Sequence, residues 1–127
     1  MKTFTEGPYY TAKEETTDAL LDKEGFLVEL GTAEGTVKLA TSGNLAIGVL
    51  TEKRKGDPHV TVRLLGKGGT VKVRAGGVIA KGANVGWGTG GKFVTMATGN
   101  TLGKKVCQGS SADGDVIEIL DAFRSIV

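Results

Sequence analysis

The most prominent candidate for chemistry is a glycine-rich run at residues 86–91, whose letters match the G-x-G-x-x-G pattern of dinucleotide-binding loops. That pattern binds a pyrophosphate only where it opens a helix, because the helix N-terminus supplies the N–H groups. Here the run leads into residues 92–96, which are typical of a strand. Residues 66–70 are similar to a phosphate loop but lack its G-x-x-x-x-G-K-[ST] spacing. We therefore predict that both runs are hairpin turns.

No residue pattern indicates catalysis, a cofactor or a metal. His59 is the sole histidine, and no serine or cysteine is arranged beside it as a nucleophile, so a surface or interface position is expected. Cys107 is the sole cysteine, which excludes an intramolecular disulfide. Asp113 and Asp115 lack the spacing of a calcium loop. We predict that the protein is not an enzyme and has no catalytic, cofactor-binding or metal-binding residues.

Aromatic side chains are better candidates for contacts with a partner. Phe4, Pro8, Tyr9 and Tyr10 lie in a polar N-terminal segment that has a single glycine, and large aromatic side chains are favoured at interfaces. Trp87 lies between glycines, where it could be an interface anchor or part of the core. We predict inter-subunit or partner contacts at these five residues.

The elements that would position these residues are short strands. Val60, Val62 and Leu64 stand at alternate positions, as do Val71 and Val73, and this period of two places alternate side chains on opposite faces. The chain has 21 glycines, which separate about ten such runs. We predict an all-β fold, a compact β-barrel or β-sandwich with one core over residues 25–127, preceded by an extended N-terminal arm over residues 1–24. The expected strands include residues 26–30, 36–40, 45–50, 60–64, 71–73, 92–96, 102–108 and 115–120.

Charge and hydropathy narrow the class of partner. The formal net charge of +2 is too small to indicate nucleic-acid binding, and the one basic cluster, residues 53–55, is predicted to be a solvated loop. No apolar stretch approaches the ~20 residues that span a membrane, and the N-terminus lacks the apolar core of a signal peptide. We therefore expect an intracellular site of synthesis and no nucleic-acid or membrane partner.

The chain also contains a faint internal repeat. Residues 47–49 lead through a loop to Gly56-Asp57 and a strand, and residues 102–104 lead likewise to Gly114-Asp115 and a strand. Two copies are too few for a solenoid. They suggest pseudo-symmetric halves of one barrel.

The order of several phrases resembles the capsid cement, or head decoration, proteins of tailed bacteriophages. These phrases are residues 35–40, 45–49, 56–57, 60–62, 76–82, 102–103 and 114–119, over roughly three-quarters of the chain. The resemblance implies a virion structural protein on the outer surface of the capsid, made in the host cytoplasm. It also implies that the protein binds the major capsid protein, as a homotrimer on local three-fold sites or as a dimer. One departure is Ala83-Asn84 after Gly82, which changes only a turn.

Two other functions are compatible with the sequence. A lipoyl- or biotin-carrier or small-ligand barrel would present Lys67 at a hairpin tip, although the Met or Asp neighbours expected of carriers are missing. The protein could also be a virion structural protein of a tail or a fibre base. Such a protein would differ from a capsid decoration protein mainly in its location, because the physical requirements on the fold are similar. The arm interpretation further predicts that deleting residues 1–22 removes binding while the β-domain still folds.

Overall fold

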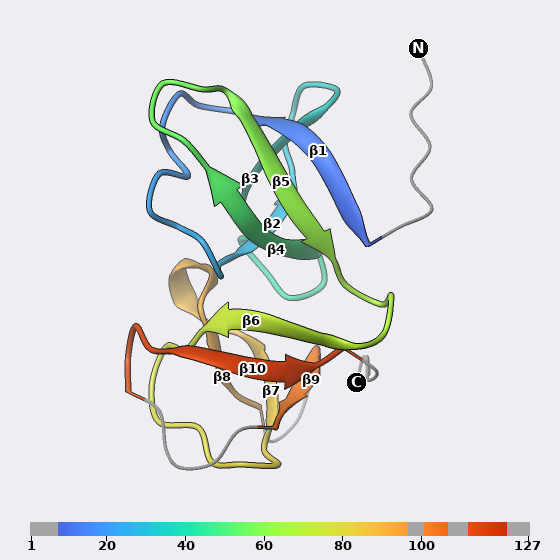
Figure 1. The fold of residues 1–127 in the computed structure, drawn as a ribbon, viewed down its shortest axis with the longest axis vertical. Coiled ribbons are helices and arrows are strands. Elements are labelled where there is room, and N and C mark those ends of the chain that lie inside the picture. The colour runs from blue at the N-terminus through green and yellow to red at the C-terminus, as the bar shows by residue number, and fades with distance from the viewer. Residues whose placement is uncertain (1–7, 97–100, 107–111, 122–127) are drawn as a thin grey trace.

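The computed structural model describes residues 8–96, 101–106 and 112–121, and within these the fold is all-β, as predicted (Figure 1). Ten strands form a closed barrel and a second, five-stranded sheet, with one short 3-10 turn, η1 (Thr89–Gly91). The strands are β1 (Tyr9–Glu14), β2 (Leu27–Leu30), β3 (Thr36–Leu39), β4 (Ala46–Lys53), β5 (His59–Leu64), β6 (Thr70–Arg74), β7 (Asn84–Trp87), β8 (Phe93–Thr95), β9 (Gly103–Lys105) and β10 (Val116–Leu120).

The barrel has the strand order β1-β3-β2-β4-β5, and β1 closes it. This strand pairs antiparallel with β5, from Tyr9 opposite Arg63 to Lys13 opposite His59, and parallel with β3. Closure leaves no free edge in this sheet. Figure 1 shows β1 alongside β5 as part of the barrel.

The predicted arm over residues 1–24 therefore needs correction in its described part. Residues 9–14 are a barrel strand, and Leu20, which is 1% exposed, packs in the barrel core. The prediction failed because a barrel strand half exposed to water carries few apolar side chains and resembles a polar arm. Deleting residues 1–22 would remove β1 and leave β3 and β5 unpaired on one side, so that deletion cannot test a binding surface separately from folding.

The second sheet has the order β6-β10-β9-β7-β8. A bridge between Ala75 and Phe93 brings its two ends together beyond β6. Residues 86–91 run from the end of β7 into the turn before β8, and these two strands are antiparallel, which confirms the predicted hairpin. Residues 66–70 are a different case. They join β5 to β6, which belong to different sheets, so this run connects the two sheets and is not a hairpin tip.

Two clusters of buried side chains replace the single core that chain length suggested. One lies inside the barrel and includes Val28, Val62 and Leu50. The other includes Leu27 and Val49 from the barrel together with Phe93 from the second sheet, so it is shared between the two sheets. Alternation explains the division, because neighbouring residues on β2, Leu27 and Val28, point to opposite faces of the strand.

The faint sequence repeat corresponds to one antiparallel pair in each sheet, β4 with β5 and β9 with β10, and not to two halves of one barrel. Each pair contains a glycine packed against its neighbour. A Cβ on Gly48 would lie 2.5 Å from the carbonyl oxygen of Arg63, and a Cβ on Gly103 would lie 2.5 Å from that of Leu120. Both glycines are therefore required for close approach of the strands.

Candidate contact surface

The start of β1 presents Pro8, Tyr9 and Tyr10 on the barrel. The N–H of Leu64 donates to the carbonyl of Pro8 at 2.6 Å, and Tyr10 lies opposite Val62, which fixes the backbone here. Alternation turns Tyr10 toward the barrel core, where it is half-buried, and leaves Tyr9 pointing outward with 54% of its surface exposed. Tyr9 is thus the side chain of this group best placed for a partner. Phe4 lies outside the described residues.

Trp87 occupies the junction between the two sheets. It ends β7 opposite Phe93, packs against the shared core, and donates its indole N–H to the carbonyl of Ala40 at 2.8 Å. Its polar atom is therefore used within the chain. The ring is half-buried against the shared core, in partial agreement with the core interpretation, whereas a contact of Trp87 with a partner stays a prediction.

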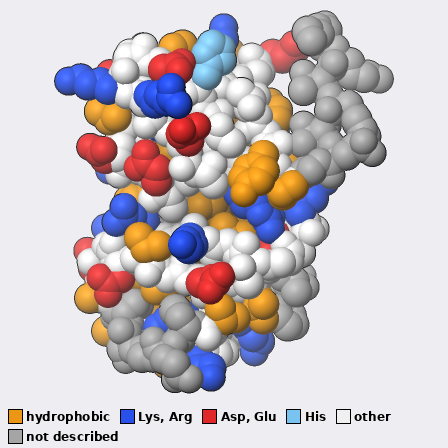
Figure 2. Space-filling model, viewed as in Figure 1, with side chains coloured by type: hydrophobic (Ala, Val, Ile, Leu, Met, Phe, Trp, Pro, Cys, Tyr) orange, Lys and Arg blue, Asp and Glu red, His pale blue; other side chains and the backbone are white. Residues whose placement is uncertain are grey.

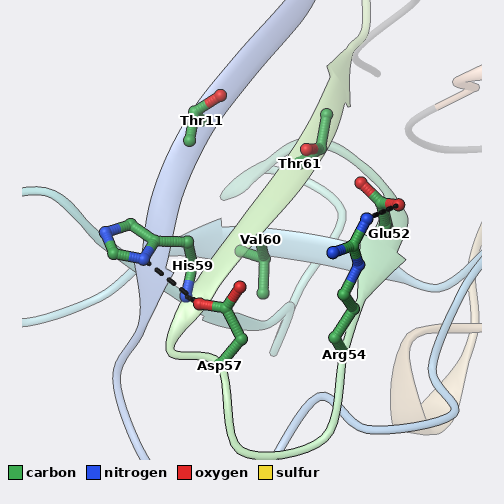
Figure 3. Close-up of a pocket in the computed structure, with 7 residues that line it drawn as sticks. All are labelled: Thr11, Glu52, Arg54, Asp57, His59, Val60 and Thr61. Atoms are coloured by element: carbon green, nitrogen blue, oxygen red, sulfur yellow. Dashed lines mark hydrogen bonds and ion pairs between the residues drawn. The ribbon is translucent and has the colours of Figure 1, made fainter.

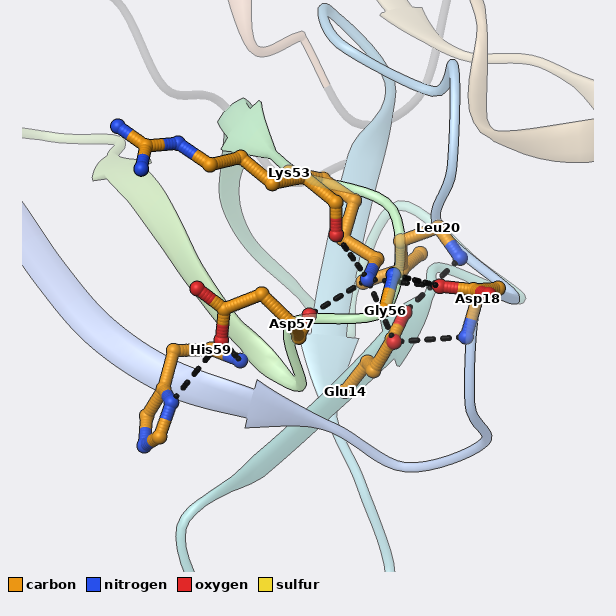
Figure 4. A network of polar contacts seen from close by, with 8 residues as sticks. Glu14, Asp18, Leu20, Lys53, Gly56, Asp57 and His59 are labelled. Atoms are coloured by element: carbon orange, nitrogen blue, oxygen red, sulfur yellow. Dashed lines mark hydrogen bonds and ion pairs between the residues drawn. The ribbon is translucent and has the colours of Figure 1, made fainter.

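A buried lysine at the end of β4, Lys53, joins several segments of the barrel, a role that was not predicted from the sequence. Lys53 Nζ lies 2.9 Å from Glu14 Oε1 and 2.9 Å from Asp18 Oδ1, and donates to the carbonyls of Arg54 and Asp57 (Figure 4). Lys53 is 6% exposed, whereas Arg54 and Lys55 are exposed. The expectation of a solvated loop therefore holds for two members of the basic cluster and is wrong for Lys53.

This Lys53 network attaches the segment after β1 to the β4–β5 loop. The Glu14 carboxylate also accepts from the N–H groups of Asp18 and Leu20, and Asp18 accepts from the N–H of Gly56. Figure 4 shows these groups converging on one point from separate segments. Because every member has several partners, the network holds Leu20 over the barrel core.

The same contacts shift several pKa values. Donation from Lys53, followed by the N–H of Gly56, lowers the pKa of Asp18 below its ordinary range. The N–H of His59 and then its ring lower the pKa of Asp57, and the N–H of Thr32 lowers that of Glu15. Burial alone would lower the pKa of Lys53, but its hydrogen bonds to Asp18 and Glu14 outweigh burial and raise it.

We expect acid to weaken the fold through these carboxylates. A carboxyl group whose pKa is lowered on folding stabilises the protein above its ordinary pKa, about 3.9 for Asp and 4.3 for Glu, and this contribution is lost as pH falls through the folded value. Urea unfolding between pH 7 and pH 3 should show the free energy of unfolding falling from about pH 4 downward. Asp18→Asn should make this decline shallower. A free energy that stays constant down to pH 3 would contradict the assignment.

A second buried ion pair joins the two sheets. Arg63 of β5 lies 2.8 Å from Asp121, which directly follows β10. Arg63 also donates to the carbonyls of Leu64 and Gly68, and Asp121 accepts from the N–H groups of Gly66 and Lys67. We call this set the Arg63–Asp121 clamp, since it holds the connection between β5 and β6.

A shallow pocket of about 240 Å³ surrounds the histidine on the barrel surface (Figure 3). His59 Nδ1 lies 3.2 Å from Asp57 Oδ1, and Arg54 faces Glu52 at 3.7 Å. Thr11, Val60 and Thr61 complete the lining. His59 is exposed, as expected from the sequence. The pairs in Figure 3 satisfy one another, and no lining group is arranged as an activated nucleophile.

The other residues weighed for chemistry are placed on the surface or outside the described ranges. Lys67 is exposed on the connection between the sheets, so it does not occupy the hairpin tip of a carrier lysine. Asp113 pairs with Lys92 at 2.9 Å, and Asp115 accepts from the N–H of Ala112. Cys107 lies outside the described residues. Among those that are described, no three His, Cys, Asp or Glu side chains are grouped to hold a metal ion.

The exposed apolar side chains are spread over both sheets. Figure 2 shows them in several separate groups on one face. The large members are Tyr9, Leu30, Leu45, Val78 and Val116, each more than half exposed. Within the described residues, no helix is long and apolar enough to cross a membrane.

The arrangement as a whole is that of an all-β protein in which polar groups consolidate the fold. Neither the protein-family models nor the curated proteins contain a match to this chain. Among solved structures, the chain is similar to the head fiber gp8.5 N base of bacteriophage phi29, with a TM-score of 0.61 and 18% sequence identity. The similarity covers 88% of this chain and 91% of the phage chain, so the two share a fold over nearly their whole lengths.

Proposed function

We propose that this protein is a virion structural protein that decorates the outer surface of a tailed-bacteriophage head and binds the major capsid protein. The observation that carries the proposal is the likeness of nearly the whole chain to a phage head fiber base. The phrases of the sequence that resemble capsid cement proteins support the same class. The fold suits the role, because a protein that braces a shell needs rigidity and exposed contacts and no active site.

The proposed contacts are Pro8, Tyr9 and Tyr10 on the barrel, with Phe4 preceding them and Trp87 at the junction of the sheets. We further propose self-association as a homotrimer on local three-fold sites, with a dimer as the other arrangement. Many copies on a lattice give high avidity even when each contact is weak. The partners are then protein surfaces, with no nucleic acid, membrane or cofactor involved.

Co-sedimentation tests the proposal directly. Purified protein should bind expanded, decoration-free heads with saturation at a fixed ratio to the major capsid protein, and should not bind unexpanded procapsids. Absence of binding to both particles would overturn the proposal.

Tyr9 offers a point substitution that leaves the barrel intact. Tyr9→Ser should weaken binding to expanded heads about tenfold if Tyr9 is a hot spot, while the thermal unfolding midpoint stays close to that of the wild type because the side chain is half exposed. Val78→Ser is the matched control, since Val78 is 71% exposed and lies beyond β6 in the second-sheet half. Equal affinities of the two variants would remove Tyr9 from the contact surface.

A fiber base is the second candidate, and the identity of the structural neighbour favours it specifically. The binding ratio separates the two roles. A decoration protein saturates in proportion to the whole lattice, whereas a fiber base occupies a restricted set of positions and carries a further chain segment or partner outward.

A further inference from the structure

The strand β6 has an open edge. It stands at one end of the second sheet and pairs only with β10 in that sheet. In an antiparallel pair, the main-chain groups of alternate residues point toward the partner strand and away from it. The N–H of Arg74 donates to Gly25 and not to β10, so Arg74, Lys72 and Thr70 form the set that points away. Figure 1 shows this edge facing the barrel.

Only one position of this edge is occupied. The carbonyl of Gly25 accepts a hydrogen bond from the N–H of Arg74 at 3.0 Å, and the N–H of Gly25 donates to the carbonyl of Leu50 in the barrel. Across the described ranges, the main-chain N–H and C=O of Thr70 and Lys72 have no hydrogen-bond partner. An edge of this kind is a template for another strand.

A groove adjoins the open edge. It has a volume of about 280 Å³ and is lined on the barrel side by residues of β4 and the segment before β2, and on the other side by β6 and β10. Val116, 56% exposed, supplies an apolar side chain directly across from Arg74. In Figure 2 the outline narrows at the level between the two sheets. The lining residues are Glu24, Gly25, Leu50, Thr51, Lys72, Arg74 and Val116.

The charges beside the edge favour an acidic occupant. Lys72 is exposed and Arg74 is half-buried, and because they are two residues apart they share one face of β6. The Arg74 guanidinium donates to the carbonyls of Glu24 and Gly114, and neither cation has a carboxylate partner within the described part of the chain. Among the groove residues these two cations outnumber the single carboxylate, Glu24, and the carboxylate of Glu118 on β10, directly opposite Lys72, forms no ion pair with it in the described part of the chain.

We propose that the open edge of β6 at Thr70 and Lys72, with its groove, binds an extended acidic segment of a capsid protein, which adds to the second sheet as a sixth strand. Main-chain hydrogen bonds hold the segment, an apolar residue contacts Val116, and a carboxylate lies opposite Lys72. The identification of the partner as a capsid protein rests on the proposed function, whereas the capacity to bind an extended strand follows from the edge itself.

Amide hydrogen exchange on the full chain tests this proposal. In the free protein, the Thr70 and Lys72 amides should exchange rapidly, and saturation with expanded heads should slow both by at least about tenfold as they become hydrogen-bonded. Binding to heads without slower exchange at these two amides would overturn the inference and leave the proposed function standing.

A proline substitution tests the same edge by affinity. Lys72→Pro removes an N–H that makes no internal hydrogen bond, so it should weaken head binding about tenfold and leave the cooperative unfolding transition in place. Lys81→Pro is the matched control, because Lys81 is also an exposed lysine. It occupies the second position of a turn whose third residue, Gly82, has φ of 82°, and proline is favoured at that second position. If Lys72→Pro does not fold, Lys72→Glu takes its place, since it keeps the N–H and reverses the charge. Wild-type affinity in the folded Lys72 variant would overturn the inference.

A peptide probe separates failure of the function from failure of the inference. If heads do not bind at all, the proposed function fails, and a synthetic peptide of alternating valine and aspartate decides the inference. Slower exchange at Thr70 and Lys72 with this peptide, and not with an alternating valine and lysine peptide, would support it; no effect would overturn it. Concentration-dependent protection of the two amides in the free protein would assign the edge to a second copy and would also overturn the proposal.

Discussion

Replacing Arg63 with methionine should lower the free energy of unfolding by about 3 kcal/mol, because it leaves a buried carboxylate without its cation. Asp121 is 3% exposed and lies 2.8 Å from the Arg63 guanidinium. Two N–H groups, from Gly66 and Lys67, would still reach that carboxylate, which places the loss at the lower end of the range for buried pairs. The substitution also releases the carbonyls of Leu64 and Gly68 from the clamp.

Urea denaturation at pH 7 measures this effect, and the chain contains a matched control. Arg54 pairs with Glu52 at 3.7 Å, but both side chains are largely exposed, so Arg54→Met should change stability by less than about 1 kcal/mol. The double variant Arg63→Met with Asp121→Asn should recover part of the loss, because it removes the unpaired charge. If Arg63→Met and Arg54→Met prove equally mild, the clamp contributes little to stability.

Gly48→Ala should destabilise the barrel by about 2 kcal/mol through overpacking. The added methyl would lie 2.5 Å from the carbonyl oxygen of Arg63 and 2.7 Å from a methyl group of Val62. One of these contacts is with backbone, which moves only if β4 and β5 separate. Gly103→Ala should behave in the same way in the second sheet, because its methyl would meet the carbonyl oxygen of Leu120 at 2.5 Å.

The control for this substitution is Gly77→Ala. Gly77 has no atom within 4 Å of an added Cβ and no left-handed backbone conformation, so alanine there should be neutral or slightly stabilising. Thermal unfolding of the three variants gives the comparison. A midpoint for Gly48→Ala within about 1 °C of that for Gly77→Ala would show that the strands adjust at negligible cost.

Alternation of apolar and polar residues along the chain was enough to predict an all-β fold and most of its strands. Val60, Val62, Val71 and Val73 are all buried, and the alternation that indicates this is visible within a few residues of sequence. It failed at β1. The inward side chains there are Tyr10, Ala12 and Glu14. Tyr10 is only half-buried, and neither alanine nor glutamate indicates a core position in a sequence. β7 was missed for a similar reason, since two of its four residues are asparagine and glycine.

Lys53 shows why the polar network lay beyond sequence reasoning. The pairing of β4 with β5 shifts between Leu50 and Glu52, so Leu50 lies opposite Val62 and Lys53 lies opposite Val60. This bulge reverses the alternation and turns Lys53 inward in place of Glu52. Its partner Glu14 belongs to β1, which is distant in sequence. The contact candidates Phe4, Pro8, Tyr9, Tyr10 and Trp87 stay predictions.

The closure of the barrel by β1 sets the order in which the protein can fold during synthesis. β1 precedes both of its partners in the chain. Its parallel pairing with β3 can form once β3 is made, but its pairing with β5, at Val62 and Arg63, must wait until three further strands and β5 itself are completed. Such non-local pairing is slow, and a waiting apolar strand would be prone to aggregate. The polar composition of β1, with Thr11, Lys13 and Glu14, keeps the waiting strand soluble, which accounts for the same feature that concealed it in the sequence.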